Sequence, residues 1–310
     1  AAGLLVVVFC AKAAVLPMYF WLPQTYTHAP AAVAALFAVM TKVGLYAVLR
    51  VGTLSFGAAG PLDGFAWPAL LALGGATLLL AALGVLASRR LRSLAAYLVL
   101  GSAATLFVAF ALATAGTVSA GLYYLAHSTF AGAALFLLAD LIRRRRGAAG
   151  DRKDMLAALP DRTVPGVLFL IAAVSLVGLP PLSGFIGKLL LLEAVPSAST
   201  GWVWALVLGT SFMMLVGLAR AGTRLFWRVE PWPDAPPERL TNYVPLDAMA
   251  VAPSRPLEAT ATMLLLAYGI AMALAAAPLL DYTRATAAQL QSPAAYVEQA
   301  RAATPMLREP

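Results

Sequence analysis

The chain alternates long apolar stretches with short polar connections. Eight apolar stretches run roughly over residues 1–23, 30–51, 69–88, 93–113, 117–142, 164–195, 202–227 and 259–280. Each has about the 20 residues, or more, that a helix needs to cross the hydrocarbon core of a bilayer. The pattern therefore predicts an all-α polytopic membrane protein with about eight transmembrane helices.

Prolines inside two of these spans predict broken helices. Pro17 interrupts the first span, and Pro180-Pro181 interrupts the sixth, just before a Ser-Gly pair. A proline leaves the carbonyl four residues earlier without its helical donor, which frees the carbonyl of Ala13 in the first span and those of Leu176 and Val177 in the sixth. A simple proline kink is the alternative. A true break is tolerated in lipid only where protein or water covers it.

Ionisable side chains stand inside the apolar spans. Lys12 and Lys188 lie close to the two proline breaks, and Lys42 and His127 lie within uninterrupted spans. A charge at the centre of a membrane helix costs about 2.5–3.5 kcal/mol even on the milder insertion scale. Lys42 lies too deep for its side chain to reach the interface. Because a desolvated lysine can release and regain a proton, these four residues predict a proton relay completed by water.

Each of these residues also has a structural alternative. His127 could serve an interhelical hydrogen bond, and Lys188 could extend its ammonium group to the interface. Asp140 stands close to the arginine run that ends the fifth span, so it is expected to pair with that run. Glu193 either tunes Lys188 or faces the outer loop, and the sequence does not separate these two interpretations.

Composition supports the membrane assignment and excludes several function classes. Hydrophobic residues make up 61% of the 310 residues and charged residues 12%, with a mean hydropathy of +0.83. Soluble domains contain about 25% charged residues. One cysteine, Cys10, and two histidines leave little to hold an iron–sulfur cluster or a haem. The chain has no phosphate loop, dinucleotide fingerprint or metal-ligand spacing. It predicts no cofactor, no metal site and no enzyme active site.

Loop charges predict the orientation. The loops after the third, fifth and seventh spans are rich in arginine, whereas those after the fourth and sixth carry no charge. Basic loops stay in the cytoplasm, so the formal charge of +8 indicates topology rather than binding to nucleic acid. Residues 228–258 predict an irregular cytoplasmic loop. Tyr282 to Pro310 predict a short surface helix and a polar tail outside the cell. Because the chain opens inside an apolar run without Met, we expect a C-terminal piece of a longer membrane protein.

Three segments carry a family resemblance. KAAVLPMYFWLPQTYTHAPAAVAALFAVMTKVGLYAVLR, HSTFAGAALFLLADLI and GLPPLSGFIGKLLLLEA resemble the proton-translocating antiporter-like subunits of respiratory complex I and of Mrp-type sodium/proton antiporters. The resemblance covers most of residues 1–228. The residues after WLP, Gln24-Thr25-Tyr26, depart from the complex I pattern, and with the tail AAQLQSPAAYVE they favour the D-type branch of the Mrp subunits.

The resemblance implies a fourteen-helix fold with two inverted five-helix repeats and broken helices seven and twelve. Residues 1–51 would then be the end of the first repeat and 69–227 the second. Residues 228–258 would be the cytoplasmic loop, and 259–310 the last transmembrane helix with the C-terminal tail. It also implies that the family's relay residues fall on Lys12, Lys42, His127 and Lys188. The acidic partner of Lys12 would lie in the N-terminal half that precedes this chain.

These features predict a multi-pass subunit of a monovalent cation (Na+)/proton antiporter in the bacterial inner membrane. Its partners would be the other subunits of the complex, Na+, H+ and the lipid bilayer, but not nucleic acid. The alternative is a proton-pumping subunit of complex I or of a membrane-bound hydrogenase, without redox centres of its own. A passive membrane scaffold is a third hypothesis, but a scaffold has no reason to bury three lysines.

Overall fold

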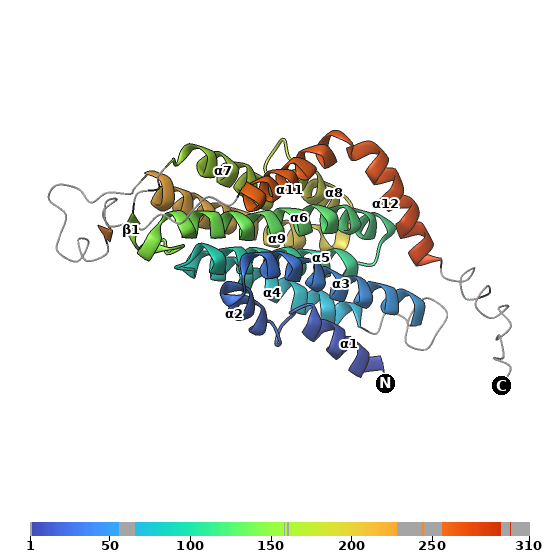
Figure 1. The fold of residues 1–310 in the computed structure, drawn as a ribbon. Helices are drawn as coiled ribbons and strands as arrows, with labels where there is room; N and C mark the ends of the chain where they lie inside the picture. Colours follow the sequence, from blue (N-terminus) through green and yellow to red (C-terminus); the bar gives the residue numbers. More distant parts are fainter. Residues whose placement is uncertain are drawn as a thin grey trace, which may run out of the picture.

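The computed structural model describes residues 2–55, 66–157, 159, 161–227, 243–244, 256–292 and 298. Most of these residues are helical, as the hydrophobic pattern predicts (Figure 1). The helices are α1 Ala2–Lys12, α2 Trp21–His28, α3 Ala31–Ser55, α4 Trp67–Ala87, α5 Leu91–Ala111, α6 Ala115–Arg145, α7 Thr163–Val177, α8 Ser183–Glu193, α9 Thr200–Gly222, α11 Pro256–Leu274 and α12 Ala276–Gln291. Two-residue strands, β1 Leu156–Ala157 and β2 Tyr243–Val244, pair in parallel.

Among the described residues, six helical segments are long and apolar enough to cross a membrane. They are Ala31–Leu54, Trp67–Ala87, Leu91–Ala111, Ala115–Arg145, Ser197–Trp227 and Pro256–Leu274. Each coincides with one of the six uninterrupted spans of the sequence pattern. The first and sixth predicted spans instead appear as pairs of shorter helices, α1 with α2 and α7 with α8. The chain therefore has the polytopic all-α architecture expected from its sequence.

Helices α5 and α6 form the centre of the bundle. Nearly every residue of α5 is buried, and α6 contacts α3, α5, α8, α11 and α12. Alanine, glycine and serine are frequent along both helices, which lets neighbouring backbones approach closely. Figure 1 shows α6 running through the middle of the bundle, with α3 on one side and α11 on the other. Polar side chains in the middle of α5 and α6, such as Ser102 and His127, are thus placed deep inside the protein.

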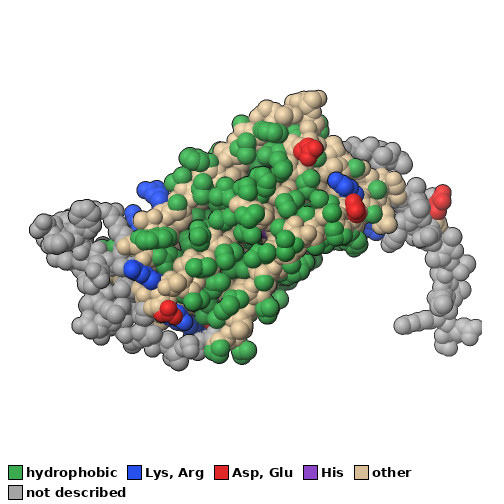
Figure 2. Space-filling view, turned by 90° about the horizontal axis from the view of Figure 1, so that it is seen from above, with side chains coloured by type: hydrophobic (Ala, Val, Ile, Leu, Met, Phe, Trp, Pro, Cys, Tyr) green, Lys and Arg blue, Asp and Glu red, His purple; other side chains and the backbone are tan. Residues whose placement is uncertain are grey.

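The outer face of the bundle is apolar. Leu36 on α3, Leu170 on α7, Phe212 on α9 and Leu264 on α11 are all exposed. Figure 2 shows apolar side chains across the middle of one face, with Lys and Arg toward its two ends. Soluble monomers rarely expose continuous apolar patches of this extent. This surface matches a lipid-facing belt.

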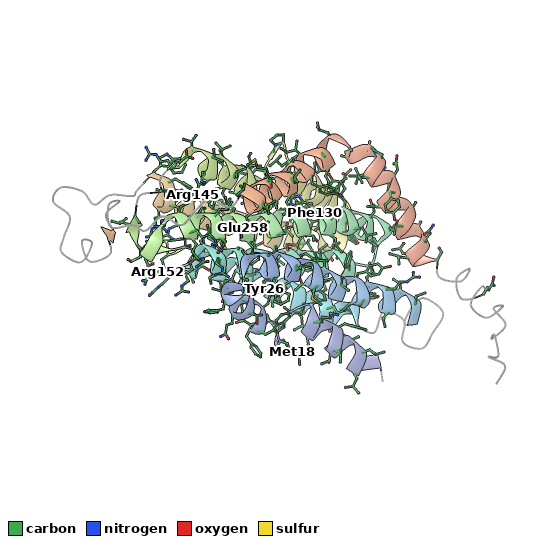
Figure 3. The ribbon with its side chains drawn as sticks, viewed as in Figure 1. Met18, Tyr26, Phe130, Arg145, Arg152 and Glu258 are labelled. Carbon is green, nitrogen blue, oxygen red and sulfur yellow. The ribbon has the colours of Figure 1, made fainter. Side chains whose placement is uncertain are left out.

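The arginine-rich end of the bundle is held by buried polar contacts. Asp140 forms ion pairs with Arg143 and Arg144, at 2.8 and 2.6 Å, which confirms the expected pairing. Arg146 is fully buried, and its guanidinium donates to the carbonyl oxygens of Gly150, Arg152 and Met155. In Figure 3, Arg145 and Arg152 lie at this same end. The basic residues therefore order the connection between α6 and α7.

The C-terminal region differs from the sequence expectation. The predicted surface helix starts at Tyr282, but α12 begins at Ala276 and packs on α6 and α3. Thr283 shares a hydrogen bond with Ser119 on α6, and the Gln291 amide donates to the carbonyl of Ala113. Apolar residues on one face of α12 favour this docking over a free position on the surface. Most of the predicted loop 228–258, and most of the tail after residue 292, lie outside the described residues.

Candidate functional site

Lys188 is tied to the break between α7 and α8. Its Nζ donates to the carbonyl oxygen of Val177 at 2.7 Å and to Oγ of Ser211 on α9 at 2.8 Å. The side chain is 8% exposed. Helix α7 ends at Val177, and Pro180-Pro181 lies in the turn before α8. A proline removes the donor that a carbonyl four residues earlier would have used. The break thus supplies an acceptor for the lysine.

Two glycines give this break its shape. Gly178 caps α7 with φ +82°, a left-handed conformation that other residues rarely adopt. A Cβ there would also come within 2.8 Å of Cδ of Lys188. A Cβ at Gly184 would collide with the carbonyl of Ser175 and lie 2.7 Å from Nε2 of His127. Small residues therefore let α7, α8 and the imidazole share one site.

His127 lies on α6 at the start of α8. Its Nδ1 is 2.8 Å from Oγ of Ser183, the first residue of that helix. The side chain is 1% exposed, and the imidazole also interacts with the backbone of Ser175 on α7. The ring of Tyr124 lies 5.7 Å from the imidazole ring. A hydroxyl thus fixes one ring nitrogen, and the ring also lies against the last turn of α7.

Lys42 is buried on α3 against α5. Its Nζ donates to Oγ of Ser102 at 2.6 Å, and that hydroxyl donates to the carbonyl of Val99. The lysine is 2% exposed. Within the described residues, neither Lys42 nor Lys188 forms an ion pair with a carboxylate. Hydroxyl and carbonyl dipoles alone support each amine, an arrangement that serves a group able to lose its charge.

Polar side chains connect these groups through the centre of the bundle. His127 interacts electrostatically with both Lys188 and Lys42. The hydroxyl of Tyr124 interacts with Thr105, which stands one helical turn beyond Ser102 on α5. The order Lys42, Ser102, Thr105, Tyr124, His127, Ser183 therefore crosses from α3 to α8. Lys188 lies at the far side of the same break.

Lys12 does not join this group in the described chain. The sequence places it inside the protein, but its side chain is exposed. Helix α1 packs on α3, and among the described helices it makes no other extensive contact. The backbone of Lys12 lies against Gly44, two residues beyond Lys42. The expectation of an interior-facing Lys12 is therefore wrong for this chain taken alone, because only one side of α1 is covered.

The first break has its own supports. Helix α1 ends at Lys12 and α2 begins at Trp21, with Pro17 in the turn between them. The Trp21 indole donates to the carbonyl of Ala11 at 2.9 Å, and the amide of Leu16 donates to Oγ1 of Thr77 at 3.1 Å. Side chains thus bond to both breaks, and within the described residues a lysine does so at the second break alone.

Sequence reasoning missed the hydroxyl residues of the site. They are Ser102, Thr105, Tyr124, Ser183 and Ser211. Each belongs to an otherwise apolar helix, so hydroxyls at buried depth were the available signal. Serine and threonine can also bond to their own helix backbone in a membrane, which makes that signal unspecific. Only the packing of α5, α6, α8 and α9 separates the two cases.

Comparisons with known proteins agree with this arrangement. Residues 1–214 match the family model described as NADH:quinone oxidoreductase/Mrp antiporter, TM. The chain is 33% identical to the D-type subunit of a probable K(+)/H(+) antiporter of Rhizobium meliloti, over 96% of this chain and 58% of that protein. It is 30% identical to the D-type subunit of the Na(+)/H(+) antiporter of Alkalihalophilus pseudofirmus, over 96% and 57%. A chain of the Mrp complex from Dietzia superposes with a TM-score of 0.78 at 26% identity, over 96% of this chain and 60% of that one.

The chain thus spans a little over half the length of these curated relatives. The match extends through both broken helices and through Lys42, His127 and Lys188, since all of them lie within the residues that the family model covers.

Proposed function

From the premise that this chain belongs to the NADH:quinone oxidoreductase/Mrp antiporter family of membrane subunits, we propose that it carries protons through its centre within a monovalent cation/proton antiporter. The relay consists of Lys42, His127 and Lys188, with bound water between them. The other subunits of such a complex, Na+ or K+, and protons are its partners. The chain works in the cell membrane of a bacterium and does not act as an enzyme by itself.

One observation carries the proposal. Lys42 and Lys188 are buried ammonium groups that rest on hydroxyl and carbonyl oxygens instead of carboxylates within the described residues. A structural buried lysine normally pairs with an acid, because an unpaired charge in the membrane is costly. An amine held only by neutral dipoles tolerates both protonation states. It can therefore receive a proton from one neighbour and pass it to the next.

His127 is placed to act between the two lysines. It interacts electrostatically with both of them, and Ser183 fixes its Nδ1. When a proton arrives on one lysine, the positive charge next to the imidazole increases. The imidazole then holds its own proton less tightly. Each transfer thus changes the balance at the next group. Water between the imidazole and the lysines completes the chain of proton carriers.

Lys12 belongs to the proposal as the group through which the relay would continue beyond this chain. Its backbone contacts α3 beside Lys42, and its exposed side chain leaves room for a partner. We expect an acidic side chain from outside the described residues to cover it. With this partner in place, the break at Pro17 would offer Lys12 a hydrogen-bond acceptor, as the break at Pro180-Pro181 offers one to Lys188.

The assay that tests this function uses the complete complex in everted membrane vesicles. A ΔpH-sensitive dye follows proton movement when Na+ or K+ is added after energisation. Cation-dependent dissipation of the pH gradient, dependent on Lys42 and Lys188, supports the antiporter. Proton pumping driven by electron transfer, with no response to either cation, would instead assign the chain to the complex I or hydrogenase branch of its family.

A further inference from the structure

A seam of small residues runs between α6 and α8, outward from His127. Cβ atoms added to the glycines of this seam would meet the facing helix at close range: Gly184 at His127, Gly187 at Tyr124, and Gly116 at Ala194. The order of these contacts is antiparallel. Two helices that meet through glycines leave little side-chain bulk between them. The glycines therefore hold α6 and α8 in close contact along a line from the imidazole to the outer ends of both helices.

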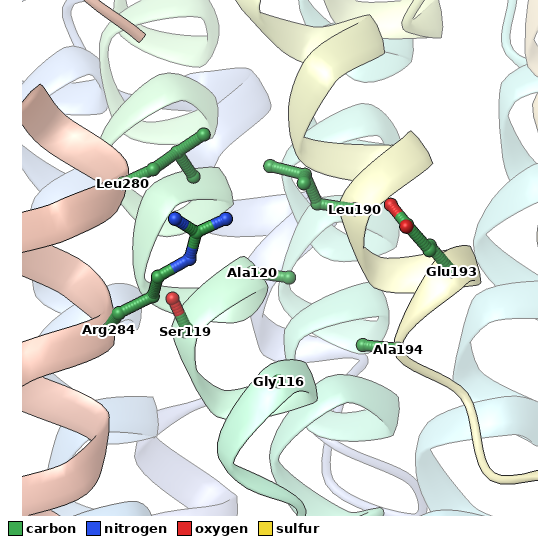
Figure 4. A pocket seen from close by; sticks show the side chains of 8 residues that line it. All are labelled: Gly116, Ser119, Ala120, Leu190, Glu193, Ala194, Leu280 and Arg284. Carbon is green, nitrogen blue, oxygen red and sulfur yellow. The ribbon is translucent and has the colours of Figure 1, made fainter. Parts of the chain in front are cut away.

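The seam opens into a pocket between α6, α8 and α12. Its volume is about 260 Å³, and it is lined by Gly116, Ser119, Ala120, Leu190, Glu193, Ala194, Leu280 and Arg284 (Figure 4). The hydrogen bond between the hydroxyls of Ser119 and Thr283 holds α12 against the beginning of α6. This pocket lies at the beginning of α6, and the arginine run lies at its other end. By the positive-inside rule, the pocket faces the outside of the cell.

Two ionisable side chains reach into the pocket from opposite walls. Glu193 is the last residue of α8, and Arg284 stands on α12 (Figure 4). Arg284 also pairs with Asp281, at 3.4 Å on the outer surface of α12. The other lining residues are uncharged. A carboxylate and a guanidinium in one small open pocket form a polar mouth at the end of an otherwise apolar helix bundle.

The pocket lies within reach of the relay. Ala120 on the pocket wall lies seven positions before His127, which is about 10 Å along a helix. Tyr124 stands halfway and packs on Gly187. A file of about three or four waters spans that length. Lys188 and Glu193 are five positions apart on α8 and point to different faces, with Lys188 toward α7 and α9.

We propose that this pocket is the outer mouth of the relay, and that Glu193 is the last group to hold the proton. The inference rests on the proposed function. The Glu193 carboxylate takes a proton from a water in the α6–α8 seam and releases it to water in the pocket, which restores the carboxylate without another reactant. Arg284 on the opposite wall balances the negative charge that remains. The side chain of Tyr124 lies between the pocket and His127, at the narrowest part of the proposed proton path.

Charge restoration at position 193 tests the mouth. The complete complex carries Glu193→Cys in a background in which Cys10 is replaced by Ala, and exchange is measured in vesicles. We expect Glu193→Gln and Glu193→Cys each to slow exchange by about tenfold or more, because a proton-transfer group is lost. 2-Carboxyethyl methanethiosulfonate restores a carboxylate, which can take up and release a proton, to the cysteine and recovers exchange. The neutral methyl methanethiosulfonate does not. Glu298→Gln, an exposed carboxylate outside the pocket, is the matched control.

Lys42→Ala separates the failure of this mouth from the failure of the relay. Exchange that is lost in Lys42→Ala but normal in Glu193→Gln, with equal amounts of assembled complex, overturns the mouth and leaves the relay standing. Recovery by both thiol reagents also overturns it, because a filled pocket and not a charge would then be sufficient. Normal exchange in both variants overturns the proposed function itself.

Discussion

The Nζ atom of Lys188 lies 2.7 Å from the carbonyl oxygen of Val177, the last residue of α7. Pro181 stands four residues beyond Val177, so it cannot supply the amide hydrogen that this carbonyl would receive in a continuous helix. The lysine replaces the missing donor. In this way the helix break and the buried charge satisfy each other, and neither needs a carboxylate.

We expect Gly178→Ala to destabilise this arrangement. Its φ of +82° costs about 1–2 kcal/mol for a residue with a Cβ, and that Cβ would lie 2.8 Å from Cδ of Lys188. Thermal unfolding of the purified complex should shift to lower temperature, and exchange should fall. Gly209→Ala on α9 is the control, because nothing lies within 4 Å of its added Cβ. Equal stability of the two variants would contradict the role of Gly178.

Tyr124 and its neighbour Tyr123 offer a matched pair. The Tyr124 hydroxyl interacts with Thr105 and its ring contacts His127, whereas the Tyr123 hydroxyl donates to the carbonyl of Met272. Both changes to Phe remove one buried hydroxyl, at a cost of about 0.5–1.5 kcal/mol of stability. Only Tyr124→Phe should slow exchange. A similar loss in both variants would mean that the link through Thr105 carries no protons.

Ser211→Ala tests whether a neutral dipole supports Lys188. The variant leaves the carbonyl of Val177 as the remaining acceptor of the lysine among the described residues. We expect the pH dependence of exchange to shift, because the protonated amine loses one of its two acceptors. Ser128→Ala on α6, whose hydroxyl bonds only to the carbonyl of Leu125 in the described chain, should leave the profile unchanged. Identical profiles for both variants would exclude this support.

Lys153 gives a pH-dependent stability outside the membrane spans. Burial, together with Arg224 and Arg220 nearby, lowers its pKa from 10.5 to about 8. Between these values the unfolded chain binds more protons than the folded one, so stability rises as the pH increases from about 8 to 10.5. Lys153→Met should therefore raise stability near pH 7, by at most about 3 kcal/mol. It should also flatten the rise in alkaline solution. Unfolding curves at several pH values check both effects.

The sequence predicted the fold well because membrane spans are directly visible as long apolar runs. Runs of about 20 apolar residues appear as the long helices, and prolines at 17 and 180–181 stand where two spans divide. The sequence also predicted a buried lysine beside the second break. The position of Pro181 alone shows that the carbonyl of Val177 is freed there. These features depend on local chemistry and on the length of the chain segment.

What the sequence could not predict depends on packing between distant elements. Ser102 meets Lys42 across 60 residues, and Ser183 meets His127 across 56. No local pattern distinguishes these hydroxyls from others in the same helices. The prediction for Lys12 was wrong for a related reason, because its burial needs a neighbour on the uncovered side of α1. The docking of α12 on α6 could not be predicted from the sequence either, because it depends on the contact between Thr283 and Ser119.

The central claim is that Lys42 passes protons, and Lys42→Ala in the complete complex tests it most directly. Everted vesicles with a normal amount of assembled complex should lose most cation-driven proton exchange. Lys42→Arg should also lose most exchange, because it keeps the charge but hardly releases a proton. The hydroxyl of Ser102 would keep its hydrogen bond to the carbonyl of Val99. Full exchange in Lys42→Ala, with the complex assembled, would contradict the account.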